Sequence, residues 1–181
     1  MSGAGRPAAG MSIVLAAAAL CGCKTLPQDA SASTRSHPLA GAWTLVSATD
    51  VSGTRSLDFY GPSPKGRIMF DADGRYMLIV LRSDLPDYAP REAGTPEDNR
   101  RVVAGSISNY GTYRTVDGVL LLTIAGSSYR RWEVEHGSPP EGAKGPQRRP
   151  FALSGDTLTY IVDPSSSGGV AKFVWRREDK P

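Results

Sequence analysis

The stretch Gly41-Ala42-Trp43-Thr44-Leu45-Val46-Ser47 opens the first strand-like run of the chain, and Phe173-Val174-Trp175-Arg176-Arg177 closes the last. A small all-β barrel must join its first and last strands, because closure alone removes the exposed sheet edges. We expect Trp43 to seal one end of such a barrel under the stem of Arg176 or Arg177, whose guanidinium can stack on the indole face. A sealed end leaves one open mouth, behind which a ligand would lie.

The segments between these two stretches predict about nine short antiparallel strands joined mostly by tight turns, which favours an up-and-down barrel over a sandwich. The Asp-Gly turns are strong hairpin signals, because glycine takes positive φ readily. The first expected strand covers 43–48, and a long polar excursion from Gly53 to Pro64 follows it. Three hairpins are expected: 66–70 with 75–81 across the turn 71–74, 109–116 with 119–125 across 117–118, and 147–153 with 157–162 across 154–156. The remaining expected strands are 127–135 and the closing stretch.

One short helix is expected within this β pattern, over about 95–108. Thr95 is a good N-cap, Pro96 suits the first helical position, and acidic residues follow in the first turn. Val102, Val103 and Ile107 then supply a short apolar face. We expect this helix to pack against the barrel or plug it rather than to catalyse a reaction.

The first segment, residues 1–23, is predicted to be a lipoprotein signal peptide. Arg6 supplies a positive charge, and the apolar stretch 13–20 is too short to span a bilayer. Leu20-Cys21-Gly22-Cys23 resembles a bacterial lipobox, which implies cleavage before Cys23 and diacylation of that residue. Two acyl chains are enough for stable anchoring. The alternative is ordinary secretion, with cleavage near the same point and no lipid.

Residues 24–38 predict a flexible tether, because they are rich in Ser, Ala, Thr and Gln and show no apolar period. A coil of that length reaches roughly 20 Å, enough to hold a domain just off a membrane surface. We expect His37 to be a solvated residue of this tail. Lys24 after the anchoring cysteine is more typical of outer-membrane sorting, so the predicted location is the cell envelope, lipid-anchored and facing the periplasm.

A series of short motifs runs through residues 39–178. After the opening Gly41–Ser47 come Tyr60-Gly61-Pro62-Ser63-Pro64-Lys65-Gly66-Arg67, Ala72-Asp73-Gly74-Arg75, Gly94-Thr95-Pro96-Glu97, Tyr110-Gly111-Thr112-Tyr113, Leu153-Ser154-Gly155-Asp156 and Val174-Trp175-Arg176-Arg177. In this order they resemble the bacterial lipocalin-like domain family, a calycin-type barrel. The resemblance implies a barrel with an internal cavity and, for most members, no established ligand. The stretch 136–141 departs from it, since a shorter loop is expected there.

Composition and motifs exclude several classes of function. A net charge of +3 is too slight for nucleic-acid binding, which usually shows as a clustered basic face. With two histidines and no cysteine beyond the anchor, no cluster has metal-ligand spacing, and no Gly-x-Ser-x-Gly elbow supports a serine triad. The turn Asp residues and scattered glycines form neither a paired-carboxylate site nor a phosphate loop. We therefore expect no metal, no cofactor and no catalytic constellation.

A polar and aromatic set remains that could face the cavity and orient an amphipathic ligand such as a fatty-acid carboxylate. Its members are Arg82, Tyr110, Tyr113, Arg131, Trp132 and Arg148. The alternative is that they are ordinary strand residues, with Tyr and Trp in the core and Arg in solvent, because a slip of one residue reverses every assignment.

These observations together predict an all-β, antiparallel up-and-down lipocalin-like barrel of about eight or nine strands with one short helix. The favoured function is that of a monomeric, membrane-tethered protein that binds a small hydrophobic or amphipathic ligand without chemistry. Two alternatives stay open. One is a barrel-type isomerase or cyclase in which an arginine–tyrosine pair polarises a carbonyl. The other is a filled barrel that acts as an envelope interaction module.

Overall fold

The computed structural model describes residues 37–57, 60–87, 90–133, 145–166 and 168–179. The strands are β1 (Gly41–Ser52), β2 (Arg55–Leu57), β3 (Lys65–Phe70), β4 (Arg75–Leu81), β5 (Ser106–Val116), β6 (Val119–Ser127), β7 (Gln147–Ser154), β8 (Thr157–Val162) and β9 (Val170–Arg177). The helical segments are the α-helix α1 (Pro96–Ala104) and the 3-10 turns η1 (Arg91–Ala93) and η2 (Arg130–Trp132).

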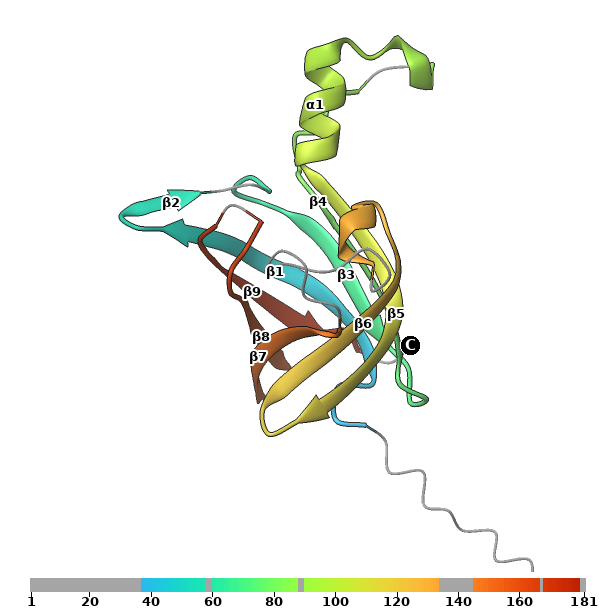
Figure 1. Cartoon of the computed structure of the whole chain (residues 1–181), viewed down its shortest axis with the longest axis vertical. Helices are drawn as coiled ribbons and strands as arrows, with labels where there is room; N and C mark the ends of the chain where they lie inside the picture. The colour runs from blue at the N-terminus through green and yellow to red at the C-terminus, as the bar shows by residue number, and fades with distance from the viewer. Residues whose placement is uncertain (1–36, 58–59, 88–89, 134–144, 167, 180–181) are drawn as a thin grey trace, which may run out of the picture. The chain divides into compact units, whose positions relative to one another are not determined.

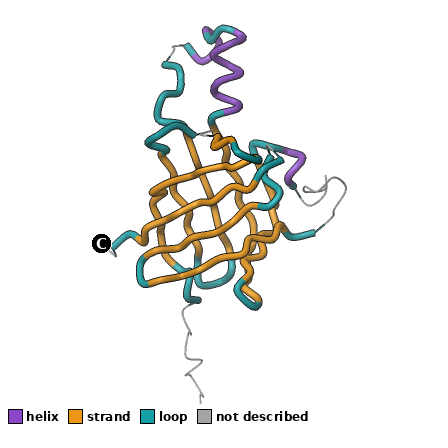
Figure 2. The backbone as a smooth tube through the Cα atoms, turned by 90° about the vertical axis from the view of Figure 1, so that its left-hand side faces the viewer, coloured by secondary structure: helices purple, strands orange, loops and turns teal. Residues whose placement is uncertain are grey.

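The strands form one antiparallel sheet that closes on itself. Their order is β2-β1-β3-β4-β5-β6-β7-β8-β9, and β1 also pairs with β9. Because β2 pairs only with the end of β1, the other eight strands make the barrel (Figures 1 and 2). The sequence prediction of an all-β up-and-down barrel with a single short helix is confirmed.

Tight turns between sequence neighbours produce most of this topology. The expected hairpins β3–β4, β5–β6 and β7–β8 all form. The turn between β5 and β6 places Asp117 at φ 48° and Gly118 at φ 74°. Positive φ at both central residues gives a turn whose twist matches that of the flanking strands, which is why an Asp-Gly pair there favours a two-residue hairpin.

Two bulges interrupt the strand pairing, and the one in β1 changes which of its side chains face the interior. The pairing of β1 with β9 shifts between Leu45 and Ser47, so Trp43 and Leu45 are buried before the bulge, whereas Ala48 and Asp50 are buried after it. A second shift falls between Tyr110 and Gly111 in the pairing of β5 with β6. A Cβ atom on Gly111 would clash with the Thr123 carbonyl oxygen, so the two backbones approach closely only because this residue is glycine.

Two sequence expectations for the strands were wrong. The polar excursion from Gly53 contains the short strand β2. The strand expected over 127–135 is absent from its described part, because β6 ends at Ser127 and η2 follows; residues 134 and 135 lie outside the described ranges. The Ser127 hydroxyl accepts a bond from Tyr129 N at 3.0 Å, and the Ser128 hydroxyl accepts one from Ser108 N at 3.0 Å. Such local bonds compete with a regular ladder.

The helix begins as predicted but neither packs against the barrel nor plugs it. Thr95 and Asp98 form a capping box, with Pro96 at the first helical position. The helix ends at Ala104, and Ile107 belongs instead to β5, where it is buried. No residue of α1 is buried, and the helix projects from one end of the barrel in both views (Figures 1 and 2).

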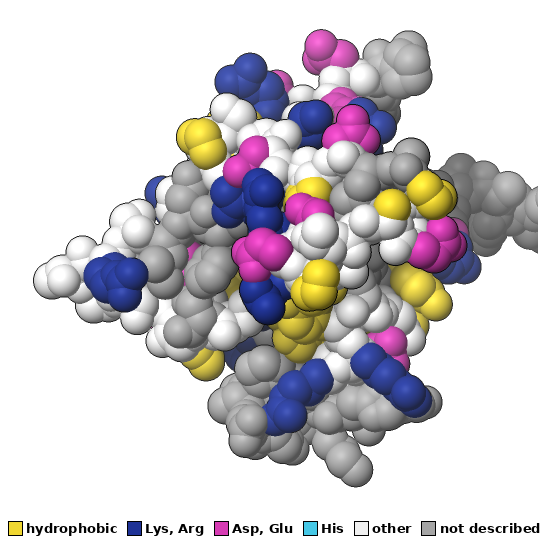
Figure 3. All heavy atoms as spheres, turned by 90° about the horizontal axis from the view of Figure 1, so that it is seen from above, with side chains coloured by type: hydrophobic (Ala, Val, Ile, Leu, Met, Phe, Trp, Pro, Cys, Tyr) yellow, Lys and Arg dark blue, Asp and Glu magenta, His cyan; other side chains and the backbone are white. Residues whose placement is uncertain are grey.

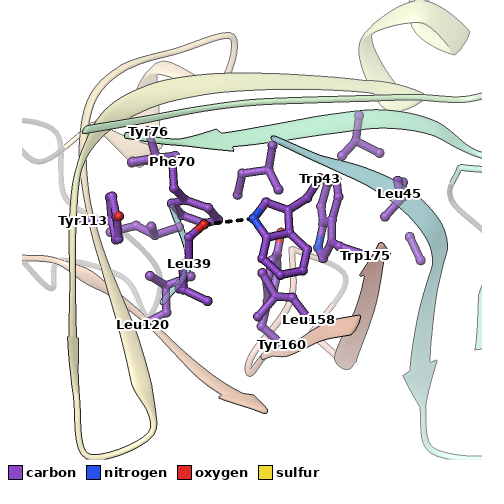
Figure 4. Packing of buried hydrophobic residues seen from close by; sticks show 14 of the residues in the cluster. Leu39, Trp43, Leu45, Phe70, Tyr76, Tyr113, Leu120, Leu158, Tyr160 and Trp175 are labelled. Carbon is purple, nitrogen blue, oxygen red and sulfur yellow. Dashed lines mark hydrogen bonds between the residues drawn. The ribbon is translucent and has the colours of Figure 1, made fainter. Parts of the chain in front are cut away.

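The opposite end of the barrel is sealed by a compact core. Trp43 and Trp175 are fully buried there together with Leu39 and Leu158. The Trp43 indole nitrogen donates a hydrogen bond of 2.9 Å to the Leu39 carbonyl oxygen (Figure 4). Since every buried polar group of this indole is satisfied, its large apolar area stabilises the fold without a desolvation penalty.

Arg177 covers this core from outside. Its guanidinium carbon lies 4.0 Å from the centroid of the Trp43 ring, and its terminal nitrogens donate to the carbonyl oxygens of Ala40 at 2.7 Å and Pro38 at 2.8 Å. The side chain therefore combines a cation–π contact with two bonds that fix the segment before β1. Arg176, by contrast, is exposed on the outer face of β9.

Arg177→Met is expected to lower the free energy of unfolding by about 2 kcal/mol, because it removes the cation–π contact and leaves two carbonyl groups without their donor. Urea denaturation followed by tryptophan fluorescence measures this loss. Arg176→Met is the matched control, and we expect it to change stability by less than about 0.5 kcal/mol. Equal effects of the two substitutions would contradict the assignment of the cap to Arg177.

His37 is not the solvated tail residue expected from the sequence. It is half-buried, and its ring meets Tyr113 edge-on at a centroid distance of 4.7 Å. Its Nδ1 atom accepts a bond from Leu39 N at 3.3 Å, and Nε2 lies 3.3 Å from the Thr115 hydroxyl. A neutral ring with the proton on Nε2 satisfies both contacts. Burial lowers the pKa of His37 from its ordinary value of 6.5.

Stability should therefore fall as the pH drops below 6.5, because the unfolded chain takes up the His37 proton before the folded chain does. The contribution of His37 to stability is fully present above the pKa that it has in the unfolded chain. It is lost as the pH falls through the lower pKa that it has in the folded chain. Urea denaturation between about pH 8 and about pH 5 measures it. In His37→Phe, which keeps a ring beside Tyr113 but cannot take a proton, this part of the pH dependence should disappear; an unchanged profile would contradict the prediction.

Candidate functional site

A cavity of about 320 Å³ lies inside the barrel, towards the end from which α1 projects. Inward-facing residues of β1 and of β4 to β9 line it, and Ala104, Trp132 and Ser165 stand at its mouth. Most of the lining is apolar. On the face seen in Figure 3, basic and acidic side chains lie beside one another, with apolar side chains exposed between them. The volume of the cavity lies at the lower end of the roughly 300–1,000 Å³ typical of small-molecule sites.

Arg149 and Asp50 are the one basic and the one acidic side chain among the described residues that line the cavity. Gln147, Arg149 and Phe151 alternate inward along β7, whereas Arg148 points outward. The guanidinium donates to the Gln147 side-chain oxygen and, at 3.0 Å, to the Arg148 carbonyl oxygen. It forms no ion pair with any residue in the described ranges. Arg149 keeps some accessible surface because it lines a cavity, yet it lies deep enough that burial lowers its pKa.

Asn109 adds hydrogen-bonding groups to the cavity wall. The Tyr76 hydroxyl donates a bond of 2.8 Å to Asn109 Oδ1, and both residues are buried. This bond occupies the Asn109 oxygen, so the amide N–H groups of Asn109 are the donors it can offer to a ligand. The cavity wall thus combines the Arg149 charge with additional N–H donors, groups that can bind an anion, and it also contains the Asp50 carboxyl group.

Aromatic rings form another part of the wall. Tyr160 on β8 and Phe173 on β9 are register partners, with ring centroids 5.1 Å apart and planes inclined by 28°. Tyr60 approaches Phe173 at 6.3 Å. At the mouth, Trp132 stacks on Tyr129 at 5.3 Å. These side chains give the cavity extended flat apolar surfaces.

The tyrosine hydroxyls of this cavity remain protonated at physiological pH. Burial, with smaller contributions from Tyr129 and Asp50, raises the pKa of Tyr60 to about 12. Burial also raises the pKa of Tyr160 in the cavity wall and that of Tyr76, which belongs to the core. A general base works best with a pKa near the operating pH, so these groups are suited to hydrogen bonding rather than to proton transfer.

The structure does not bring the six candidate ligand residues predicted from the sequence together around the cavity. Trp132 lines the cavity. Tyr113 is buried in the core, where its hydroxyl donates to the Asp71 carbonyl oxygen at 2.8 Å. Arg82 stands at the end of β4 and pairs with Asp84 at 2.8 Å rather than lining the cavity.

The remaining candidates do not face the interior, and this expectation was wrong. Tyr110 is 57% exposed on the outer face of β5, and Arg148 is exposed on the outer face of β7. Arg131 is exposed on η2 rather than on a strand. Of the predicted closure residues, Trp43 and Arg177 meet, whereas Arg176 is turned outward. Cys23 and the insertion-like stretch 136–141 lie outside the described residues.

Sequence reasoning missed Arg149, although a signal for it exists. In the stretch Gln147-Arg148-Arg149-Pro150-Phe151, the aromatic residue is the member best suited to the interior. The period of two residues then places Arg149, not Arg148, on the same face as Phe151.

A scan against protein-family models and a search of curated proteins each found no match for the chain. The described residues contain neither a helix long and apolar enough to cross a bilayer nor a cluster of three or more His, Cys, Asp or Glu side chains suited to a metal ion. What the structure defines is a closed antiparallel β-barrel with an internal, mostly apolar cavity.

Proposed function

We propose that this chain is a lipocalin-like binding protein that holds a small amphipathic ligand in its barrel, with the ligand's carboxylate against Arg149. One observation carries the proposal. The Arg149 guanidinium lines a mostly apolar cavity and has no carboxylate partner among the described residues.

A buried guanidinium is costly unless an anion or several acceptors surround it. The two acceptors that Arg149 has, Gln147 and the Arg148 carbonyl, are neutral and engage only part of its five N–H groups. A ligand carboxylate can take two parallel N–H bonds from such a fork, and each is stronger than a neutral bond. The apolar remainder of the ligand would lie against the aromatic rings.

The cavity supports this function over the alternatives left open by the sequence. Its volume favours a hollow barrel over one filled by its own side chains. The raised tyrosine pKa values favour binding over isomerase or cyclase chemistry that needs a proton to move near neutral pH.

We further propose that the protein is a lipoprotein of the cell envelope, anchored through Cys23 and facing the periplasm, with a tether that ends before His37, since His37 and Pro38 pack against the barrel. The lipobox-like sequence supports the anchor. The position of Leu39 in the sealed core supports the arrangement, because the chain enters the barrel at the end opposite the cavity mouth.

Isothermal titration calorimetry of the purified full-length protein tests the ligand-binding function. The probes are naphthoate and undecanoate, each compared with its neutral primary amide. We expect at least one carboxylate to bind about 10- to 100-fold more tightly than its amide, because the amide cannot form charge-assisted bonds with Arg149. Binding of neither acid, or equal binding of acid and amide, would contradict the proposal.

A further inference from the structure

The cavity walls also bear on the shape of the ligand. We infer that the cavity selects a compact, planar aromatic carboxylate rather than an acid with a long alkyl chain. This inference rests on the proposed function and adds the chemical class of the ligand.

The first observation is the arrangement of the aromatic rings. Tyr160, Phe173 and Trp175 follow one another with nearly parallel planes: Tyr160 and Phe173 are inclined by 28°, and Phe173 and Trp175 by 13°. Trp175 is fully buried behind them, so it holds the series in place. Flat rings packed in this way offer a rigid surface on which a further ring can stack, whereas an alkyl chain gains only ordinary apolar contact.

The second observation is the closeness of the charge to this wall. Tyr160 belongs to the stacked series and lines the same cavity as Arg149, whose positive charge opposes the rise in the pKa of the Tyr160 hydroxyl that burial causes. Phe151, two residues from Arg149 on β7, pairs directly with Tyr160 on β8. A ligand that contacts both features therefore needs its carboxylate close to its ring system, as in an aromatic acid.

The third observation is the depth of the cavity. Trp43, Trp175 and Leu158, all fully buried, close the barrel below it, so a chain cannot extend through to the other end. With a volume of about 320 Å³, the cavity is short and compact. A long alkyl chain would have to fold back on itself there and would lose the freedom of many rotatable bonds, whereas a fused ring system has none to lose.

Calorimetric titration of the full-length protein with naphthoate and with undecanoate, which have the same number of carbon atoms, tests this inference. We expect naphthoate to bind about 10-fold more tightly. Phe173→Leu should weaken naphthoate about 5-fold or more and change undecanoate by less than about twofold, since only naphthoate stacks on this ring. Thermal unfolding of the variant shows whether it folds.

The outcomes separate the two proposals. Undecanoate binding as tightly as naphthoate, while each exceeds its amide, would overturn the aromatic class and leave the carboxylate-binding function intact. Failure of both acids to bind would overturn the binding function and this inference with it. The comparison of the two acids on the unsubstituted protein decides the matter even if Phe173→Leu does not fold.

Discussion

Arg149→Met is expected to weaken the binding of a carboxylate ligand about 10- to 100-fold, because the substitution removes the charge-assisted hydrogen bonds and keeps the apolar stem. The neutral amide of the same ligand should lose little affinity. Since Arg149 has no ion-pair partner among the described residues, its removal should not lower the free energy of unfolding. A loss of binding would then reflect the missing charge and not a loss of fold.

Arg148→Met provides the matched control. It removes the same side chain from the neighbouring position of β7, on the outer face of the barrel. Binding of the carboxylate should stay within about twofold of the unsubstituted protein, since long-range effects of an exposed charge are screened by salt. Equal losses in the two variants would show that general electrostatic attraction, rather than a site inside the barrel, binds the acid.

Trp43→Ala should lower the free energy of unfolding by about 3–5 kcal/mol, the usual cost of deleting a large buried aromatic side chain. The indole is fully buried, bonds Leu39 through its N–H and supports the Arg177 guanidinium. Its loss would leave a cavity in the sealed end and an unsatisfied Leu39 carbonyl. Urea denaturation monitored by far-ultraviolet circular dichroism measures the change.

Met69→Ala is the control for this prediction. Met69 lies on β3, one residue from Ile68, which pairs with Trp43, and it is 47% exposed on the outer face. Its removal should cost less than about 0.5 kcal/mol. A cost of under about 1 kcal/mol for Trp43→Ala would show that the sealed end is not the main core of the barrel.

Strand existence and turn positions follow from the sequence, because they depend on local chemistry. The Asp117-Gly118 pair specifies its hairpin through φ values that few other residues accept, and Thr95 specifies the helix start through its capping box. The closure of the barrel was predictable because a large aromatic residue in the first strand and an arginine at the end of the last can stack, although the sequence did not decide between Arg176 and Arg177.

The interior face was not predictable at every position, because it depends on pairing between distant strands. The bulge beside Val46 reverses the alternation halfway along β1, and nothing in the local sequence marks it. On β7 the alternation is regular, and an error of one residue was enough to select Arg148 in place of Arg149. The prediction that the helix packs against the barrel was wrong, because its apolar residues Val102 and Val103 suggest a packing face that the barrel does not cover.

The crystal structure of the full-length protein with naphthoate would test the central claim most directly. We predict ligand density inside the barrel, with carboxylate oxygens at about 2.7–3.0 Å from the Arg149 guanidinium nitrogens. A ligand bound only on the outer surface, or a barrel interior filled by its own side chains with Arg149 turned to solvent, would contradict the account.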